Sequence, residues 1–124
     1  MFRVNDDKSI YTTRGDIGSF NVAAKDGKVP YVFQAGEVVQ FKVFEKNNVE
    51  SVVLQKNFPV EEATESVGVW LTGEETKIGE AISKPVEYWY EVVLNPVTAP
   101  QTIVGYDDDG AKIFMLFPEG GDLH

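Results

Sequence analysis

The run Val86–Leu94 reads VEYWYEVVL and is dominated by β-branched and aromatic residues, which favour strands over helices. Successive side chains of a strand point to opposite faces, so this strand has two different sides. One side carries Tyr88, Tyr90, Val92 and Leu94, and the other carries Glu87, Trp89, Glu91 and Val93. The first side has the composition of a core. The second side is mixed, and its tryptophan is not needed on a face that meets only water.

Two more apolar runs follow this strand, Gln101–Tyr106 and Ala111–Phe117, with Asp107-Asp108-Asp109-Gly110 between them. The closing Asp-Gly pair favours a tight hairpin turn, because glycine accepts the positive φ that such turns need. The sequence therefore predicts a strand followed by a hairpin in this part of the chain.

The rest of the chain shows the same pattern of short extended runs between turn signals. Val38–Glu45 and Ser51–Phe58 are joined by a polar turn and predict a second hairpin. Thr72–Lys84 has a capping-box spacing at Thr72 and Glu75 but little of an apolar stripe, so we expect at most one helical turn. About eight short strands without a long helix predict an all-β chain.

We expect a single immunoglobulin-like antiparallel β-sandwich over residues 1–118 and a flexible tail over residues 119–124. A sandwich is favoured over a barrel because the turn spacing is irregular and the Thr72–Lys84 connection is long enough to cross between sheets. A chain of 124 residues is ordinarily one domain, and such a domain buries roughly two-thirds of its unfolded surface. It can therefore build a core without cross-links.

Composition and charge exclude several classes of function. No cysteine is present, which excludes disulfides and thiolate metal sites and leaves the redox compartment open. The net charge of -9 argues against nucleic-acid binding, which depends on clustered Lys and Arg. No apolar run reaches the ~20 residues that span a bilayer, and no basic segment precedes an apolar one at the N-terminus. We therefore expect neither membrane insertion nor a signal peptide.

The residue types that carry catalysis are sparse. The only histidine, His124, is the last residue. Asp107–Asp109 could supply oxygen ligands to calcium but lacks the spacing of an EF-hand loop, so a turn is the favoured interpretation. Glu74 and Glu75, or the group Glu61–Glu65, could pair as glycosidase carboxylates, but nothing in the sequence brings two of them into a pocket. We expect no catalytic residue, no metal site and no cofactor, and therefore a non-enzymatic protein.

Two tryptophans and a valine are the candidate partner-binding residues. Trp70 and Trp89 each fall on the side of their strand opposite its regular apolar stripe, and Val93 accompanies Trp89. Three interpretations stay open for these side chains: loops cover them, they form an apolar patch for a partner, or they stack on a sugar. The patch predicts a homo-oligomer, whereas the sugar platform predicts a carbohydrate-binding module.

Four segments together follow the pattern of a known family. They are Ile17–Phe20, Tyr31–Glu45 with its Gly-Glu turn, Val67–Lys84, and Tyr88–Val92 with the apolar runs after it. The chain thereby resembles the immunoglobulin-like N-terminal domain of baseplate upper proteins, small β-domains of tails in phages and prophages of Gram-positive bacteria. Longer baseplate proteins continue into a stalk or a receptor-binding module, which we do not expect after Gly121, so the place of this chain within a tail stays open.

The resemblance implies a structural protein of the virion. Such a domain holds its position in the phage tail baseplate and joins neighbouring subunits or receptor-binding proteins, after assembly in the host cytoplasm. The resemblance brings no catalytic residue. The alternative from another class is a carbohydrate-binding module that attaches the particle to the host cell surface.

Overall fold

A computed structural model describes residues 1–119 and confirms the all-β class. The strands are β1 (Phe2–Val4), β2 (Ile10–Thr13), β3 (Gly18–Val22), β4 (Lys25–Asp26), β5 (Val29–Pro30), β6 (Val38–Glu45), β7 (Asn48–Pro59), β8 (Val67–Leu71), β9 (Val86–Leu94), β10 (Gln101–Val104) and β11 (Lys112–Phe117). One short helix, α1 (Gly73–Thr76), follows β8. No helix within residues 1–119 is long and apolar enough to cross a membrane.

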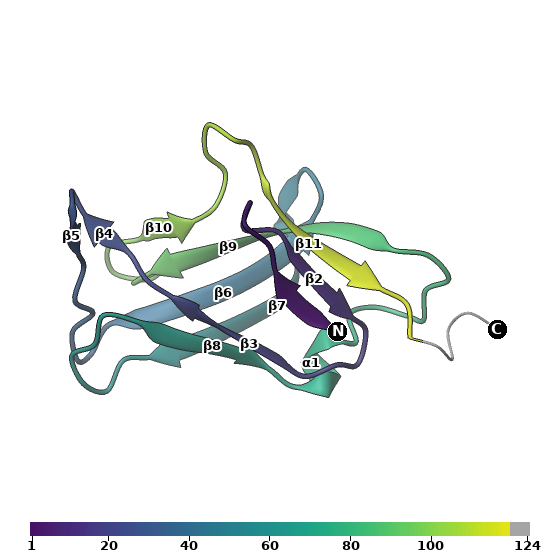
Figure 1. Cartoon of the computed structure of the whole chain (residues 1–124), viewed down its shortest axis with the longest axis horizontal. Coiled ribbons are helices and arrows are strands. Elements are labelled where there is room, and N and C mark those ends of the chain that lie inside the picture. The colour runs from purple at the N-terminus through teal and green to yellow at the C-terminus, as the bar shows by residue number, and fades with distance from the viewer. Residues whose placement is uncertain (120–124) are drawn as a thin grey trace.

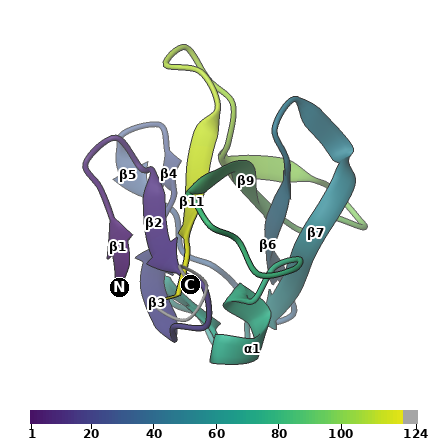
Figure 2. The ribbon, with the colours of Figure 1, turned by 90° about the vertical axis from the view of Figure 1, so that its right-hand side faces the viewer.

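The strands form a sandwich of two layers (Figure 1). The first layer is a seven-stranded sheet in the order β1-β2-β11-β9-β6-β7, in which β10 also pairs with β9. The second layer is the antiparallel pair β3–β8, and a separate pair, β4–β5, lies at one end of the molecule. Figure 2 shows the large sheet running from β1 on one side to β7 on the other, with β3 and α1 beneath it.

The core lies between the layers, where the inward side chains of both meet. Phe41 in β6 is fully buried, and its ring centroid lies 5.8, 5.6 and 6.2 Å from those of Phe20, Tyr90 and Phe114. Two-residue periodicity identifies much of this inward set from the sequence alone. The alternating residues of β6 and β8 that it predicts to face inward are buried: Val39, Phe41, Val43, Val67, Val69 and Leu71.

The hairpin predicted for Gln101–Phe117 is wrong, although its turn forms. Asp107 and Gly110 exchange backbone hydrogen bonds of 3.2 and 2.9 Å, and Gly110 has a φ of 95°. The strands on either side do not pair with each other, because both pair with β9. The turn therefore belongs to an excursion, residues 105–111, that leaves the sheet between β10 and β11.

Strand β9 explains this arrangement. β6 pairs with one edge of β9 over most of its length, so a single edge remains for the strands that follow in the chain. Gln101 pairs with Leu94 at one end of that edge, and Lys112 pairs with Tyr90 further along it. β9 is long enough to hold both strands in line, and the antiparallel partner of β10 is thus β9 rather than β11.

The sheet also departs from the predicted purely antiparallel pattern. β2 runs parallel to β11, with Ile10 opposite Phe114, so the large sheet is mixed. Eleven strands are present within residues 1–119 instead of about eight, partly because β4 and β5 form where only a turn was predicted. The predicted pairing of β6 with β7 is confirmed, and β7 ends at Pro59.

Helix α1 is the one helical turn that the sequence predicts, and its capping box is confirmed. Thr72 Oγ1 accepts a hydrogen bond from the Glu75 N–H (3.2 Å), and the Glu75 carboxylate accepts one from the Thr72 N–H (2.8 Å). The predicted tail, residues 119–124, lies outside the described residues except for Glu119. The Glu119 carboxylate is 3.9 Å from the Lys77 ammonium group.

Candidate functional site

The structure separates the three residues that the sequence proposes as partner contacts. Trp70 lies in β8, in the two-stranded layer, and is 52% exposed. Trp89 and Val93 lie in β9 and point away from the core, where Trp89 is half-buried and Val93 is only 8% exposed. The two tryptophans therefore belong to different layers and share no patch, and Val93 offers little surface to a partner.

Trp70 is held by contacts within the chain. The Lys56 ammonium group lies 3.2 Å from the centroid of the Trp70 ring and donates to the Trp70 carbonyl (3.0 Å) and the Glu75 carboxylate (2.8 Å). Burial opposes ionisation of Glu75, but the hydrogen bonds from Lys56 and Thr72 outweigh it and hold the pKa of Glu75 below its ordinary value. Because the lysine covers one face of the indole, that face is not open for stacking on a sugar.

The outer face of the seven-stranded sheet is formed by the outward side chains of β2, β6, β9 and β11. Strand register places Phe44, Trp89 and Ile113 directly opposite one another across β6, β9 and β11. On the same face, Met115 in β11 lies between Tyr11 in β2 and Glu87 in β9. Side chains directly opposite on one face of a sheet are in contact range, so these rows form a continuous surface.

Aromatic contacts extend these rows into an apolar strip. The Phe117 ring packs on Tyr11 with centroids 5.5 Å apart. Tyr106, from the excursion between β10 and β11, packs on Trp89 with centroids 6.1 Å apart and is 75% exposed. We define the apolar strip by the residues that keep accessible surface there: Tyr11, Trp89, Tyr106, Ile113, Met115 and Phe117.

Five of these residues were not singled out from the sequence, although a signal for three of them was present. Residues 113–117 read IFMLF, which is apolar on both faces of the strand rather than alternating. Such runs are typical of strands that are covered on both sides. Within residues 1–119, β3 and β8 cover only the inner side of the large sheet. The outward residues Ile113, Met115 and Phe117 thus lack the second layer that their composition indicates.

Two ion pairs and one cation–π contact engage charged side chains among the strands of the outer face. Lys42 pairs with Glu91 (3.0 Å) and Lys46 with Glu87 (3.5 Å), and the Arg3 guanidinium lies 5.2 Å from the Tyr11 ring centroid. These basic side chains offset the two glutamates, whereas the Asp107–Asp109 turn after Tyr106 adds acidic side chains at one border of the strip. Away from that border, little like-charge repulsion opposes the approach of an acidic protein to this surface.

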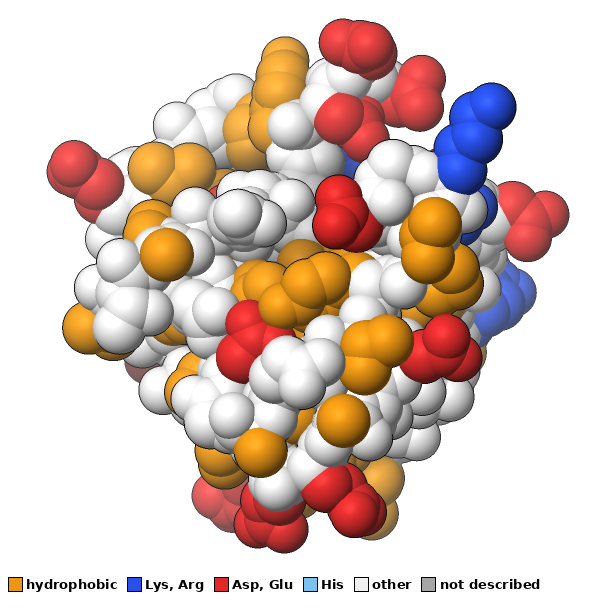
Figure 3. All heavy atoms as spheres, turned by 90° about the vertical axis from the view of Figure 1, so that its left-hand side faces the viewer, with side chains coloured by type: hydrophobic (Ala, Val, Ile, Leu, Met, Phe, Trp, Pro, Cys, Tyr) orange, Lys and Arg blue, Asp and Glu red, His pale blue; other side chains and the backbone are white. Residues whose placement is uncertain are grey.

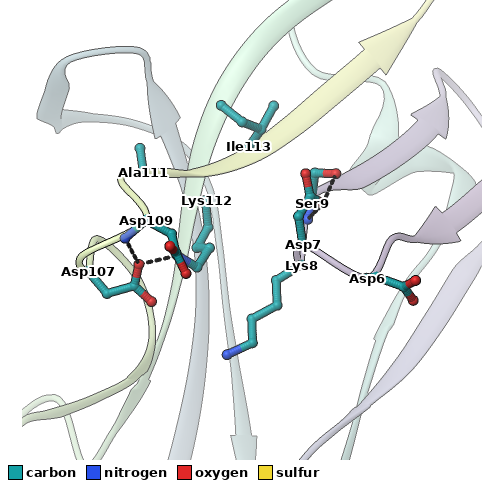
Figure 4. A pocket seen from close by; sticks show the side chains of 9 residues that line it. All are labelled: Asp6, Asp7, Lys8, Ser9, Asp107, Asp109, Ala111, Lys112 and Ile113. Carbon is teal, nitrogen blue, oxygen red and sulfur yellow. Dashed lines mark hydrogen bonds and ion pairs between the residues drawn. The ribbon is translucent and has the colours of Figure 1, made fainter.

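The acidic turn Asp107–Asp109 is engaged within the chain (Figure 4). Lys112, only 5% exposed, donates to Asp107 Oδ1 (2.7 Å) and to the Gly110 carbonyl (3.3 Å). Hydrogen bonds from Lys112 and from the Asp109 N–H hold the pKa of Asp107 below its ordinary value. Among residues 1–119, no group of three or more acidic or histidine side chains is arranged to hold a metal ion.

The glutamates considered as glycosidase carboxylates have other surroundings. Glu61 and Glu62 line a shallow hollow of about 320 Å³, and both are exposed to water. A glycosidase acid needs burial in an apolar setting to raise its pKa, which an exposed side chain does not have. Glu75 is bonded to Lys56, so its carboxylate already has a structural role.

Glu37 joins the loops at the end of the molecule that carries β4, β5 and β10. Its carboxylate accepts hydrogen bonds from the Gln34 N–H (2.7 Å), the Tyr31 hydroxyl (2.7 Å) and the Asn95 side-chain amide (2.9 Å). The bond from Gln34 is the largest influence, and together these donors hold the pKa of Glu37 below its ordinary value. One carboxylate therefore ties the segment before β6 to the turn after β9.

A Glu37→Gln variant is expected to lose about 1 kcal/mol of unfolding free energy at pH 7, because charge-assisted hydrogen bonds are replaced by weaker ones. The folded pKa of Glu37 lies below the ordinary value of 4.5, so this contribution is complete above pH 4.5 and is lost as pH falls through the folded pKa. Urea unfolding at pH 7 and pH 3 checks this result. A difference between wild type and variant that is equally large at both values would contradict it.

Comparisons with protein-family models, with curated proteins and with solved structures found no match to the chain. The function is therefore inferred from the packing, charge and strand register described above.

Proposed function

We propose that the chain is a non-enzymatic assembly module that binds a second copy of itself through the apolar strip. The observation that carries this proposal is the outward row of Ile113, Met115 and Phe117, on a strand whose other side already packs in the core. Burying apolar surface stabilises a complex by about 25 cal/mol per Å² before the costs of association. Aromatic residues and methionine are also enriched where proteins meet, and the strip contains both types.

The ion pairs of the outer face favour a second copy as the partner. In a two-fold dimer the same patch meets itself, so a patch rich in one sign of charge would repel its own copy. Lys42–Glu91 and Lys46–Glu87 neutralise one another on this face. These two pairs therefore add little repulsion between two chains of net charge -9, and the aspartates that border the strip are the remaining like charges near it.

The connectivity supports an immunoglobulin-like fold for the module. β3 and β8 form one sheet, whereas β6, β9 and β11 lie together in the other with β7 beside β6. Strands B and E, and strands C, F and G with C′, are divided in this way in immunoglobulin variable-type domains. We further propose that the module belongs to the baseplate of a phage tail or a phage-derived tail. The resemblance of the sequence to baseplate upper proteins implies this assignment.

A Met115→Lys variant is expected to weaken self-association about tenfold or more, because a hydrated ammonium group would have to be buried at the centre of the strip. In the monomer the introduced side chain lies opposite Glu87, which favours folding. Sedimentation over a range of concentrations, with circular dichroism for the fold, measures both effects.

The matched control is Val49→Lys, which adds the same charge to an exposed position of β7 outside the strip. It should leave self-association unchanged. A wild-type chain that stays monomeric at millimolar concentration, or equal association of the two variants, would rule out the strip as a dimer interface.

The carbohydrate alternative makes a different prediction for the tryptophans. A sugar platform requires that soluble glycans quench tryptophan fluorescence, whereas the assembly module predicts no quenching at Trp70, whose ring is covered on one face by Lys56. A Trp89→Ala variant should fold and lose self-association. Quenching by a cell-wall glycan that Trp70→Ala abolishes would favour the alternative.

A further inference from the structure

The chain leaves one strand position beside β10 empty. β10 pairs with β9 along one edge. β11 continues along the same edge of β9 and has β2 on its other side. β2 begins at Ile10, opposite Phe114, and does not extend as far as β10. Within residues 1–119, no strand therefore pairs with the second edge of β10. An edge of this kind presents unpaired backbone N–H and C=O groups to any extended segment that can reach it.

A groove of about 730 Å³ runs along this edge. Residues Gln101, Thr102 and Ile103 of β10 line one part of it, and the segment Ala23–Asp26 lines another. Leu94 and Tyr31 add apolar surface. Figure 3 looks onto the end of the molecule that carries β4, β5 and β10, and hydrophobic side chains gather near the middle of this face.

Edge protection differs between β10 and the other long edge of the sheet. β7 carries Lys56 and ends at Pro59, and its pairing with β6 has register shifts. Charges, prolines and bulges on an edge strand hinder pairing with another chain. β10 reads QTIV and contains neither a charge nor a proline. The edge that borders the groove thus lacks a charge and a proline, although β10 also shifts register against β9 between Thr102 and Val104.

The charged residues that line the groove are two lysines and one aspartate, Lys8, Lys25 and Asp26. Neither lysine takes part in a salt bridge with another residue of the described chain. Lys8 has a φ of 71°, and its carbonyl accepts a hydrogen bond from the Tyr90 hydroxyl, which fixes its backbone beside the groove. Lys8 also acts electrostatically on Asp107. The groove lining therefore carries two lysines against one aspartate in a chain of net charge -9, and Lys8 also lines the adjoining aspartate-rich cavity.

We propose that this groove binds an extended peptide segment that adds as a strand to β10 and places a carboxylate beside Lys8 or Lys25. Unpaired backbone groups select an extended backbone, the apolar lining accepts alternate side chains, and the lysines select the carboxylate. β10 has four residues, so the paired segment spans about 13 Å. Aspartates 6, 7, 107 and 109 line the adjoining cavity and oppose an acidic segment there. This surface lies apart from the apolar strip and does not depend on it.

The test titrates the pentapeptide Thr-Val-Glu-Val-Thr, acetylated and amidated at its ends, into the full chain while backbone amide signals are followed by NMR. The Met115→Lys variant, whose self-association is expected to be weaker, is used beside the wild type so that shifts caused by the peptide are separated from shifts caused by self-association. Signals of Gln101–Val104 and Ala23–Asp26 are expected to shift. Two versions of the peptide, each N-methylated along one of its two edges, should bind differently. Only one edge of the peptide pairs with β10, so N-methylation of that edge should abolish binding.

Two further comparisons test the charge. Replacing the peptide's glutamate by glutamine, or Lys25→Gln in the protein, should weaken binding about two- to fivefold, the effect of one exposed ion pair. Lys28→Gln is the matched control, because Lys28 lies in the same β4–β5 hairpin as Lys25 but does not line the groove. The proposal is overturned if no signals shift at millimolar peptide, if both N-methylated peptides bind like the parent, or if acetate alone gives the same shifts.

Discussion

Phe41→Ala is expected to lower the free energy of unfolding by about 3–5 kcal/mol. The Phe41 side chain is fully buried in β6, and its ring contacts aromatic rings from both layers of the sandwich. Phe20 belongs to the two-stranded layer and Tyr90 to the large sheet, so truncation leaves a cavity where the layers meet. A domain of this size is stable by about 5–15 kcal/mol, so the expected loss is a large fraction of the total stability.

The matched control is Ile17→Ala, at a hydrophobic residue that is 79% exposed. This truncation should change stability by about 0.5 kcal/mol or less, since little apolar surface is returned to water. Urea unfolding followed by tryptophan fluorescence measures both variants. If Phe41→Ala lost no more stability than Ile17→Ala, the packing described for the core would be wrong.

Much of the core was predictable because it depends on periodicity within single strands. Alternation in Val38–Glu45 and Val67–Leu71 sets which side chains share a face, and burial then distinguishes the inner face from the outer one. The Thr72 and Glu75 capping box was equally local, since its hydrogen bonds join residues three apart in the chain. Features that depend on short-range geometry are thus accessible from the sequence.

Strand pairing was less accessible because it depends on distant parts of the chain. Asp109-Gly110 favours a tight turn, and the turn forms, but its flanking strands gain more partners by extending the β9 edge in line. The parallel pairing of β2 with β11 joins segments from opposite ends of the chain. No turn signal in either segment indicates which neighbour it will have, so only the assembled sheet decides it.

The candidate site was predicted only in part, because it also depends on which strands become neighbours. Alternation correctly placed Trp89 on the outer side of its strand, but it does not reveal which strands will be neighbours. Trp70 faces outward as predicted, yet its ring meets Lys56, which lies 14 residues earlier in the chain. The run at residues 113–117 indicates that Ile113 and Met115 are covered, but only the strand register shows that they lie beside Trp89 and Tyr11.

Thr76→Val is expected to lower the free energy of unfolding by about 2–3 kcal/mol, because two backbone groups lose their hydrogen-bond partner. The Thr76 hydroxyl is fully buried in α1; it donates to the Asp16 carbonyl (2.8 Å) and accepts from the Gly15 N–H (3.0 Å). These bonds tie the helix after β8 to the turn that leads from β2 to β3. They therefore join the two layers of the sandwich at one end.

Thr76→Ser is the matched control, because it keeps the hydroxyl and removes only one methyl group. It should cost about 1 kcal/mol, whereas valine preserves the side-chain shape and removes the hydrogen bonds. Urea unfolding gives both values, and amide hydrogen exchange at Gly15 reports the lost bond directly, since its protection should fall in the valine variant alone. Equal destabilisation by the two substitutions would show that packing at Thr76, and not its hydroxyl, connects the layers.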